Sequence, residues 1–240
     1  MRSFVFALLA SSSLLSSCHF FVGERVSGNG HIVSRERETG NFSGVEVSGS
    51  LKVHVRQASA ASVKIETDEN LMDLVEVFTE GNTLVIRTKK GYNLDPTGDI
   101  VAYVAAPEFK SLDVSGQCDI VSDSPLSGNA ELALGLSGQG DIQLEVHYPK
   151  ISSQISGQGN IRLRGEAKDF DAHVSGQGDV KCFDLITDNT QLDLSGDSDV
   201  EVTANKQLDV EASGSSSVHY KGNPNVNQRT SGSGSINKVS

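Results

Sequence analysis

A short phrase recurs seven times between residues 115 and 236 of this chain. It begins with Ser-Gly, continues in most copies with Gln-Gly-Asp or a close variant, and ends on Ile or Val. Its serines are 22, 19, 19, 20, 18 and 18 residues apart, at Ser115, Ser137, Ser156, Ser175, Ser195, Ser213 and Ser231. A fixed period near 20 residues is the signature of a solenoid, in which one structural unit stacks on the next.

Apolar residues alternate with polar ones on both sides of each phrase, which is typical of half-buried strands. They recur five residues before the serine, one before, five after and seven after, so equivalent residues would stack into a core that no single unit could bury. We predict an all-β, single-domain parallel β-helix or solenoid with rungs of about 19 residues and an irregular N-terminal portion. Two of the apolar columns are Leu132, Ile151, Phe170, Thr190, Leu208 and Val226, and Ile120, Ile142, Ile161, Val180, Val200, Val218 and Ile236.

The irregular portion precedes the repeats. Residues 42–55 alternate around Ser48-Gly49-Ser50 and predict two strands. A single helical turn is predicted near residues 68–75, a hairpin turn at 80–82, and a polar loop at 89–98 before a further strand.

The extreme N-terminus predicts export rather than structure. Phe4 to Leu15 is apolar but too short to span a bilayer, and Leu15-Ser16-Ser17-Cys18 resembles a bacterial lipobox. We therefore assign residues 1–17 to a lipoprotein signal peptide, 18–41 to a tether and 42–240 to the solenoid domain, with Cys18 lipidated. An ordinary secretory peptide with an incidental cysteine is the alternative. His19 takes the place of the aspartate that favours inner-membrane retention, which predicts an outer-membrane lipoprotein facing either the periplasm or the cell exterior.

The charge balance excludes one class of partner. Twenty Lys and Arg against 31 Asp and Glu give a net charge of −11, and binding nucleic acid requires a positive patch. The six histidines neither cluster nor share a column, and no phosphate loop or nucleophile elbow is present. We predict no cofactor, no metal site and no enzymatic activity.

Two further cysteines, Cys118 and Cys182, fall at different positions of different units. Three rungs of about 4.8 Å separate them by about 14 Å, beyond the limit for a disulfide, so two free thiols are predicted.

Two polar columns of the phrase are each open to two interpretations. Glutamines could contact carbohydrate or form a side-chain hydrogen-bond ladder, and the ladder is favoured. Aspartates could bind calcium or cap turns, and capping is favoured because the row is interrupted by Asn160. The corner glycines are expected at positive φ or where no Cβ fits. These glycines are Gly116, Gly138, Gly157, Gly176, Gly196, Gly214 and Gly232; the glutamines are Gln117, Gln139, Gln158 and Gln177; the acidic column is Asp119, Asp141, Asn160, Asp179 and Asp199.

Residues 39–239 resemble the auto-transporter adhesin head GIN domain family. The features that match are the opening Phe42-Ser43-Gly44-Val45-Glu46-Val47, the run Val101-Ala102-Tyr103-Val104, and Leu112-Asp113-Val114 before the Ser-Gly repeats. The resemblance implies a β-helix-like stack, secretion or lipid anchoring, and a source among Bacteroidetes-type bacteria. It transfers no catalytic residue.

Three functions follow as expectations. The first is a non-enzymatic envelope lipoprotein whose solenoid head is an adhesion, interaction or structural module. The second is a glycan-binding or glycan-processing β-helix protein, and the third is a self-associating envelope scaffold. The partners expected are the membrane, through the lipid anchor, and an unidentified protein or glycan, with a homo-oligomer as a further option.

Overall fold

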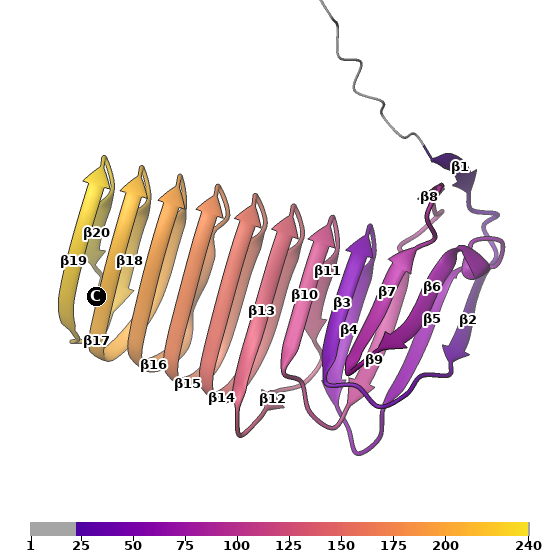
Figure 1. Ribbon diagram of the computed structural model, residues 1–240, viewed down its shortest axis with the longest axis horizontal. Helices are drawn as coiled ribbons and strands as arrows, with labels where there is room; N and C mark the ends of the chain where they lie inside the picture. The colour runs from indigo at the N-terminus through magenta and orange to yellow at the C-terminus, as the bar shows by residue number, and fades with distance from the viewer. Residues whose placement is uncertain (1–22, 240) are drawn as a thin grey trace, which may run out of the picture.

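The computed structural model describes residues 23–239, which form a solenoid with two facing layers of strands (Figure 1). Each regular rung descends through the back layer, bends at the lower edge, rises through the front layer and reverses at a glycine corner on the upper edge. The signal peptide predicted at residues 1–17 and the lipidated Cys18 lie outside the described residues.

The front layer joins strands that are far apart in the sequence. Its order is β7 (Thr83–Thr88), β3 (Gly44–Gly49), β10 (Ser111–Gly116), β13 (Glu131–Gly138), the second halves of β14 (Asp141–Gly157), β15 (Asn160–Gly176), β16 (Val180–Gly196) and β17 (Asp199–Gly214), and β19 (Asn225–Gly232). All of these neighbours are parallel.

The back layer follows the same principle. Its order is β9 (Val101–Ala106), β4 (Lys52–Gln57), β11 (Asp119–Ser122), the first halves of β14 to β17, β18 (Ser217–Lys221) and β20 (Ser235–Lys238). The short β12 (Leu126–Ser127) pairs with β14 near the lower edge.

The register confirms the predicted solenoid with rungs of about 19 residues. Ser137 pairs with Ser156, and the other phrase serines are in register in the same way. The apolar columns fill the space between the layers, where Ile151, Phe170 and Leu208 are almost completely buried. The last rung turns polar: Gln228, Thr230 and Lys238 take core-facing register positions and are exposed.

The corner glycines are required for two reasons. Their φ angles lie between 85° at Gly116 and 141° at Gly157, a region that L side chains rarely adopt. A Cβ at any of the seven would also collide with the carbonyl oxygen of the corner glycine on the preceding rung. Stacked corners therefore leave no room for a side chain.

Both predicted free thiols are free and buried. Burial raises the pKa of Cys118 to about 11 and that of Cys182 to about 12, which suppresses the thiolate. Each side chain is part of the core.

The N-terminal end is capped by antiparallel strands. These are β2 (Ile32–Arg37), β5 (Ser62–Asp68) and β6 (Val75–Glu80), with the 3₁₀ turn η1 (Met72–Leu74) between β5 and β6. The predicted helical turn and hairpin are confirmed here.

The tether predicted at residues 18–41 needs a correction. Within it, Glu24–Ser27 is β1, which pairs with β8 (Tyr92–Asp95), and Ile32–Arg37 is β2. The β8 strand likewise lies inside the predicted polar loop. These segments contain few apolar residues, and backbone pairing holds them in place, between β1 and β8 and between β2 and β5.

A buried carboxylate also fixes this end. Asp68, at the end of β5, accepts hydrogen bonds from the Gly30 amide at 2.7 Å, the Thr97 amide at 2.9 Å and the Thr97 hydroxyl at 2.8 Å. Burial alone would raise the pKa of Asp68, but these donors outweigh it and hold the pKa below its ordinary value.

We expect Asp68→Asn to loosen the β1–β8 end without unfolding the repeats. A carboxylate with a lowered pKa stabilises the fold above the pKa of the unfolded chain, and the effect is lost as the pH falls through the folded pKa. Protection of the Gly30 and Thr97 amides from hydrogen exchange, measured relative to the intrinsic rate at each pH, should therefore fall in the wild type as the solution is acidified, and in Asp68→Asn already at neutral pH. The control is Asp73→Asn, an exposed carboxylate paired with Arg35. Equal exchange in both variants at neutral pH would contradict this role.

Candidate binding trough on the front layer

The outward side chains of the front layer line a continuous trough along the solenoid axis. Three adjoining hollows of about 470, 290 and 660 Å³ follow one another from β3 to β19. The first two share Asp113, Gly135 and Gln154, and the last two share Gln191 and Asp193. We call this surface the front trough.

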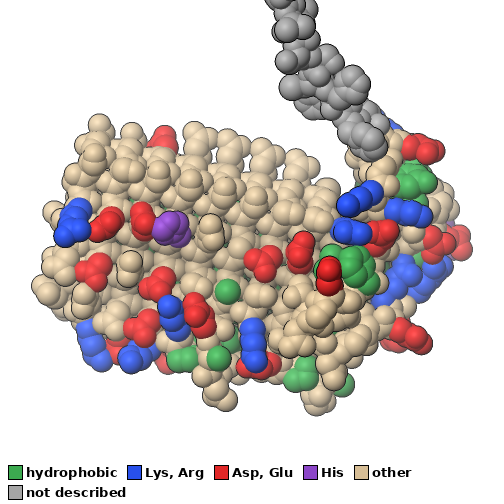
Figure 2. Space-filling view, in the orientation of Figure 1, with side chains coloured by type: hydrophobic (Ala, Val, Ile, Leu, Met, Phe, Trp, Pro, Cys, Tyr) green, Lys and Arg blue, Asp and Glu red, His purple; other side chains and the backbone are tan. Residues whose placement is uncertain are grey.

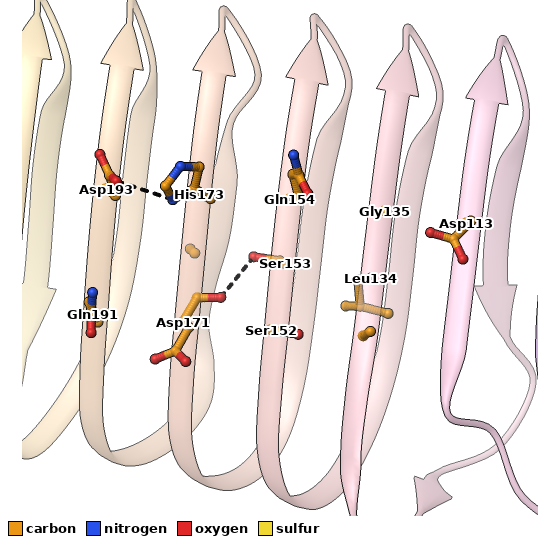
Figure 3. Close-up of a pocket in the computed structure, with 12 residues that line it drawn as sticks. Asp113, Leu134, Gly135, Ser152, Ser153, Gln154, Asp171, His173, Gln191 and Asp193 are labelled. Atoms are coloured by element: carbon orange, nitrogen blue, oxygen red, sulfur yellow. Dashed lines mark hydrogen bonds and ion pairs between the residues drawn. The ribbon is translucent and has the colours of Figure 1, made fainter.

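Register places one outward row of the trough two residues before each phrase serine. Asp113, Gly135, Gln154, His173 and Asp193 follow one another in this row from β10 to β16 (Figure 3). A second row lies four residues before each serine and is polar except at Ala133; it runs through Ser111, Ala133, Ser152, Asp171, Gln191, Asp209 and Asn227.

Gly135 makes a notch in the floor of the front trough. The Asp113 carboxylate leans toward it, so that a Cβ at position 135 would collide with Oδ1. Gln154 lies in register on the other side of the notch, on β14. The notch is therefore bordered by a carboxylate and an amide.

The charges that line the front trough are mostly negative. Six carboxylates face one guanidinium and one imidazole: Glu46, Asp113, Asp171, Asp193, Asp209 and Glu211 against Arg229 and His173. The space-filling view shows this face as largely uncharged and polar, with acidic side chains across its middle (Figure 2). No Phe or Tyr side chain lines it.

Some of these carboxylates are neutralised by neighbours and others are not. His173 lies 3.3 Å from Asp193, and Lys150, below the trough, lies 2.9 Å from Asp171. Glu46 and Asp113 are in register on adjacent strands, and neither has an ion-pair partner among residues 23–239. Partial burial, and then the nearby Glu46, raise the pKa of Asp113. Of the carboxylates that line the front trough, this pair should therefore attract a cation most strongly.

The predicted glutamine column lies at the upper edge, outside the trough. Hydrogen bonds run from Gln117 to Gln139 at 3.3 Å, from Gln139 to Gln158 at 3.0 Å and from Gln158 to Gln177 at 2.8 Å. The amides thus form a ladder from rung to rung, and this geometry leaves them engaged with one another.

The acidic column on the other side of the corner also links rungs. The Asp141 amide donates to Asp119, the Asn160 amide to Asp141 and the Asp199 amide to Asp179, at 3.0, 3.1 and 3.0 Å. Within residues 23–239, no three His, Cys, Asp or Glu side chains are grouped so that they could hold a metal ion.

Sequence reasoning did not identify the front trough. The repeated phrase lies at the glycine corner of each rung. The trough is lined by the residues before the phrase, which vary from unit to unit. The signal that could have found it is the alternation itself, because outward positions two and four residues before each serine must share a surface.

The family model described as "Putative auto-transporter adhesin, head GIN domain" matches residues 41–224. The chain belongs to this family. The head GIN domain thus covers the cap from β3 onward and nearly all of the repeats, as the sequence resemblance predicts. No curated protein matches the chain significantly.

Solved structures share the fold of this head GIN domain. A "putative adhesin" from Bacteroides fragilis superposes with a TM-score of 0.84 at 20% identity, over 89% of this chain and 100% of the other. A "putative lipid binding protein" from Parabacteroides distasonis gives 0.74 at 26% identity, over 90% and 100%. A "putative adhesin" from Parabacteroides merdae gives 0.68 at 21%, over 91% and 100%. Among the described residues of this chain, no helix has the length and apolarity to cross a membrane.

Proposed function

We propose that this protein is a lipid-anchored envelope adhesion module, without enzymatic activity, that presents the front trough to a partner. The observation that carries the proposal is the continuity of the trough over the stacked rungs. A surface repeated at every rung suits an elongated partner, and membership of an adhesin-like family is in keeping with this role.

The lipid anchor is supported by the lipobox at residues 15–18 and by the way the chain enters the domain. The Glu24 amide donates to the Gly91 carbonyl at 2.7 Å, which ties the chain to the capped end of the solenoid. Glu24 lies six positions after Cys18, and an extended chain spans at most about 20 Å over that length. A lipid on Cys18 would thus hold the capped end near an outer membrane, with the open C-terminal rung pointing away.

Glycan binding is the second candidate, since the trough offers hydroxyls, amides and carboxylates in a regular array. A lipid acyl chain fits this site less well than a polar ligand, because carboxylates and the amide of Gln154 lie among the outward side chains that line it. Self-association through the last rung is disfavoured by the polar residues at its core-facing positions, such as Gln228 and Thr230.

We expect Cys18→Ala to abolish acylation and release the protein from the membrane fraction. Metabolic labelling with a clickable fatty acid, followed by fractionation, measures both effects. Multiple acyl chains hold a protein stably on a bilayer, so nearly all membrane association should disappear. Ser17→Ala keeps a small residue before the cysteine and is the matched control. Absence of label on the wild type would overturn the anchor.

The adhesive role is tested with beads that carry the purified protein coupled through its N-terminus. Wild-type beads should bind to envelope preparations or intact cells, and beads carrying Gly135→Gln, whose side chain displaces the Asp113 carboxylate, should bind less. Equal binding by beads carrying Glu201→Gln, on the back layer, is the control. If the wild-type beads bind no more than uncoated beads, the adhesive role fails.

A further inference from the structure

The front trough has a repeat that is set by the backbone. Neighbouring strands lie about 4.8 Å apart, so equivalent outward side chains recur at that interval along the axis. This interval is close to the length of one pyranose unit in an extended glycan. A polysaccharide lying along the trough would thus bring one sugar over each rung, and would meet the same two rows of side chains at each.

The charge of the trough selects among such polymers. Six carboxylates line it against Arg229 and His173, and Glu46, Asp113 and Asp209 have no ion-pair partner among the described residues, which opposes an anionic chain and favours a cationic one. Glu46 and Asp113 lie side by side with no cation paired to either among the described residues, and the Asp113 carboxylate lies over Gly135, which has no side chain.

A basic peptide fits the site less well than a glycan. Peptides commonly bind sheets by adding a strand to an exposed edge, where backbone groups are free. The strands beneath the trough are interior strands of the layer, paired on both sides from β3 to β17. A ligand in the trough therefore contacts side chains only, which suits a polyhydroxylated chain.

We propose that the front trough binds a glycan that carries free amino groups, extended along the solenoid axis, with one ammonium group at the neighbouring carboxylates of Asp113 and Glu46. The amide of Gln154 and the carboxylates of Asp171 and Asp193 contact its hydroxyl and amino groups on the following rungs. This assignment rests on the proposed function, because it names the ligand class of the same surface.

The test is titration calorimetry of the full mature protein with a glucosamine hexasaccharide. Saturable binding is expected, weakening as salt is raised because the charges are exposed. Asp113→Asn should weaken binding about tenfold, as expected for one hydrogen bond to a charged group. Gly135→Gln should weaken binding because its side chain would displace the Asp113 carboxylate, and its melting temperature reports whether it folds. Asp193→Asn removes a second carboxylate of the trough without a change at position 135, and it should also weaken binding. Glu201→Gln on the back layer should bind like the wild type.

Three comparison ligands decide the ligand class. The N-acetylglucosamine hexasaccharide removes the positive charges, hexalysine keeps charge without sugar, and a hyaluronan oligosaccharide reverses the charge. The proposal predicts that all three bind at least tenfold more weakly than the glucosamine hexasaccharide. It is overturned if glucosamine does not saturate the protein, if hexalysine binds as tightly, or if Asp113→Asn and Asp193→Asn both leave the affinity unchanged. Wild-type beads that still adhere to envelopes while glucosamine fails would reject this ligand and keep the adhesive role, whereas failure of both rejects both.

Discussion

Replacing Gly157 with alanine should lower the free energy of unfolding by about 3 kcal/mol or more, since it combines two penalties. At φ 141° an L residue is strained by about 1–3 kcal/mol. The added Cβ would also overlap the Gly138 carbonyl oxygen on the preceding rung. That oxygen belongs to a stacked backbone and accepts the Gln158 amide at 2.8 Å, so it cannot move alone. Overpacking of this kind costs about another 1–3 kcal/mol.

Thermal unfolding measures the effect, and two other glycines separate its causes. For a chain of this size, 1 kcal/mol shifts the melting temperature by about 2–4 °C, so Gly157→Ala should melt about 6–12 °C lower. Gly81 has a φ of 59° with nothing within 4 Å of an added Cβ, so Gly81→Ala should cost only about 1 kcal/mol. Gly98 has neither constraint, and Gly98→Ala should be close to neutral. If Gly157→Ala were no worse than Gly81→Ala, stacking of the corners would not be the reason for glycine.

The repeated part of the fold could be predicted from sequence because local pattern and long-range pairing coincide there. The same spacing that places Leu132, Ile151 and Phe170 in one column also fixes which residues pair across rungs. The spacing within one unit therefore predicts which of its residues pair with those of the units on either side. Sequence alone could not place the extra residue of the 20-residue step, which the structure accommodates as a register shift between Lys181 and Leu185, opposite Arg162 and Gly165 of the preceding unit.

The N-terminal cap could not be predicted to the same depth, for a physical reason. Strands β1 and β8 are four residues each, carry few apolar side chains and form by backbone pairing to each other. Nothing in their composition distinguishes them from a polar loop. The role of Asp68 could not be predicted from sequence either, because its three hydrogen-bond donors come from Gly30 and Thr97, which are distant in the chain.

The front trough could be predicted from sequence only in part, less well than the repeats and better than the N-terminal cap. Its existence follows from alternation, but its notch depends on Gly135, where one unit has a glycine and its neighbours have Asp113 and Gln154. The corner phrase is better understood as scaffold: it spaces the rungs and holds the outward rows in place. Any selectivity of the front trough for a ligand must come from the outward positions that differ between rungs, because identical side chains at every rung could not discriminate one part of a ligand from another.

The second large effect is expected for Phe170→Ala, in the middle of the stack. Phe170 is 1% exposed and lies in register between Ile151 and Thr190. Truncation leaves a cavity between two rungs, and Phe→Ala changes of this kind cost about 3–5 kcal/mol. The matched control is Phe183→Ala. That side chain is half-buried on the back layer beneath the Lys221 ammonium, 4.4 Å from the ring centre, and should cost about 1 kcal/mol or less.

The position of Phe170 in the stack gives this prediction a further consequence. In a solenoid each rung contacts only its neighbours, so stability is a sum of rung and interface terms. Weakening a central rung loosens the interfaces on both sides, whereas Val226→Ala, in the same column of the last rung, affects one interface and a half-buried side chain. Chemical denaturation should therefore show a large loss and a broadened or two-step transition for Phe170→Ala, and a small uniform shift for Val226→Ala. Equal losses would mean that the stack unfolds without regard to rung position, and that the core is not organised as a chain of neighbouring interfaces.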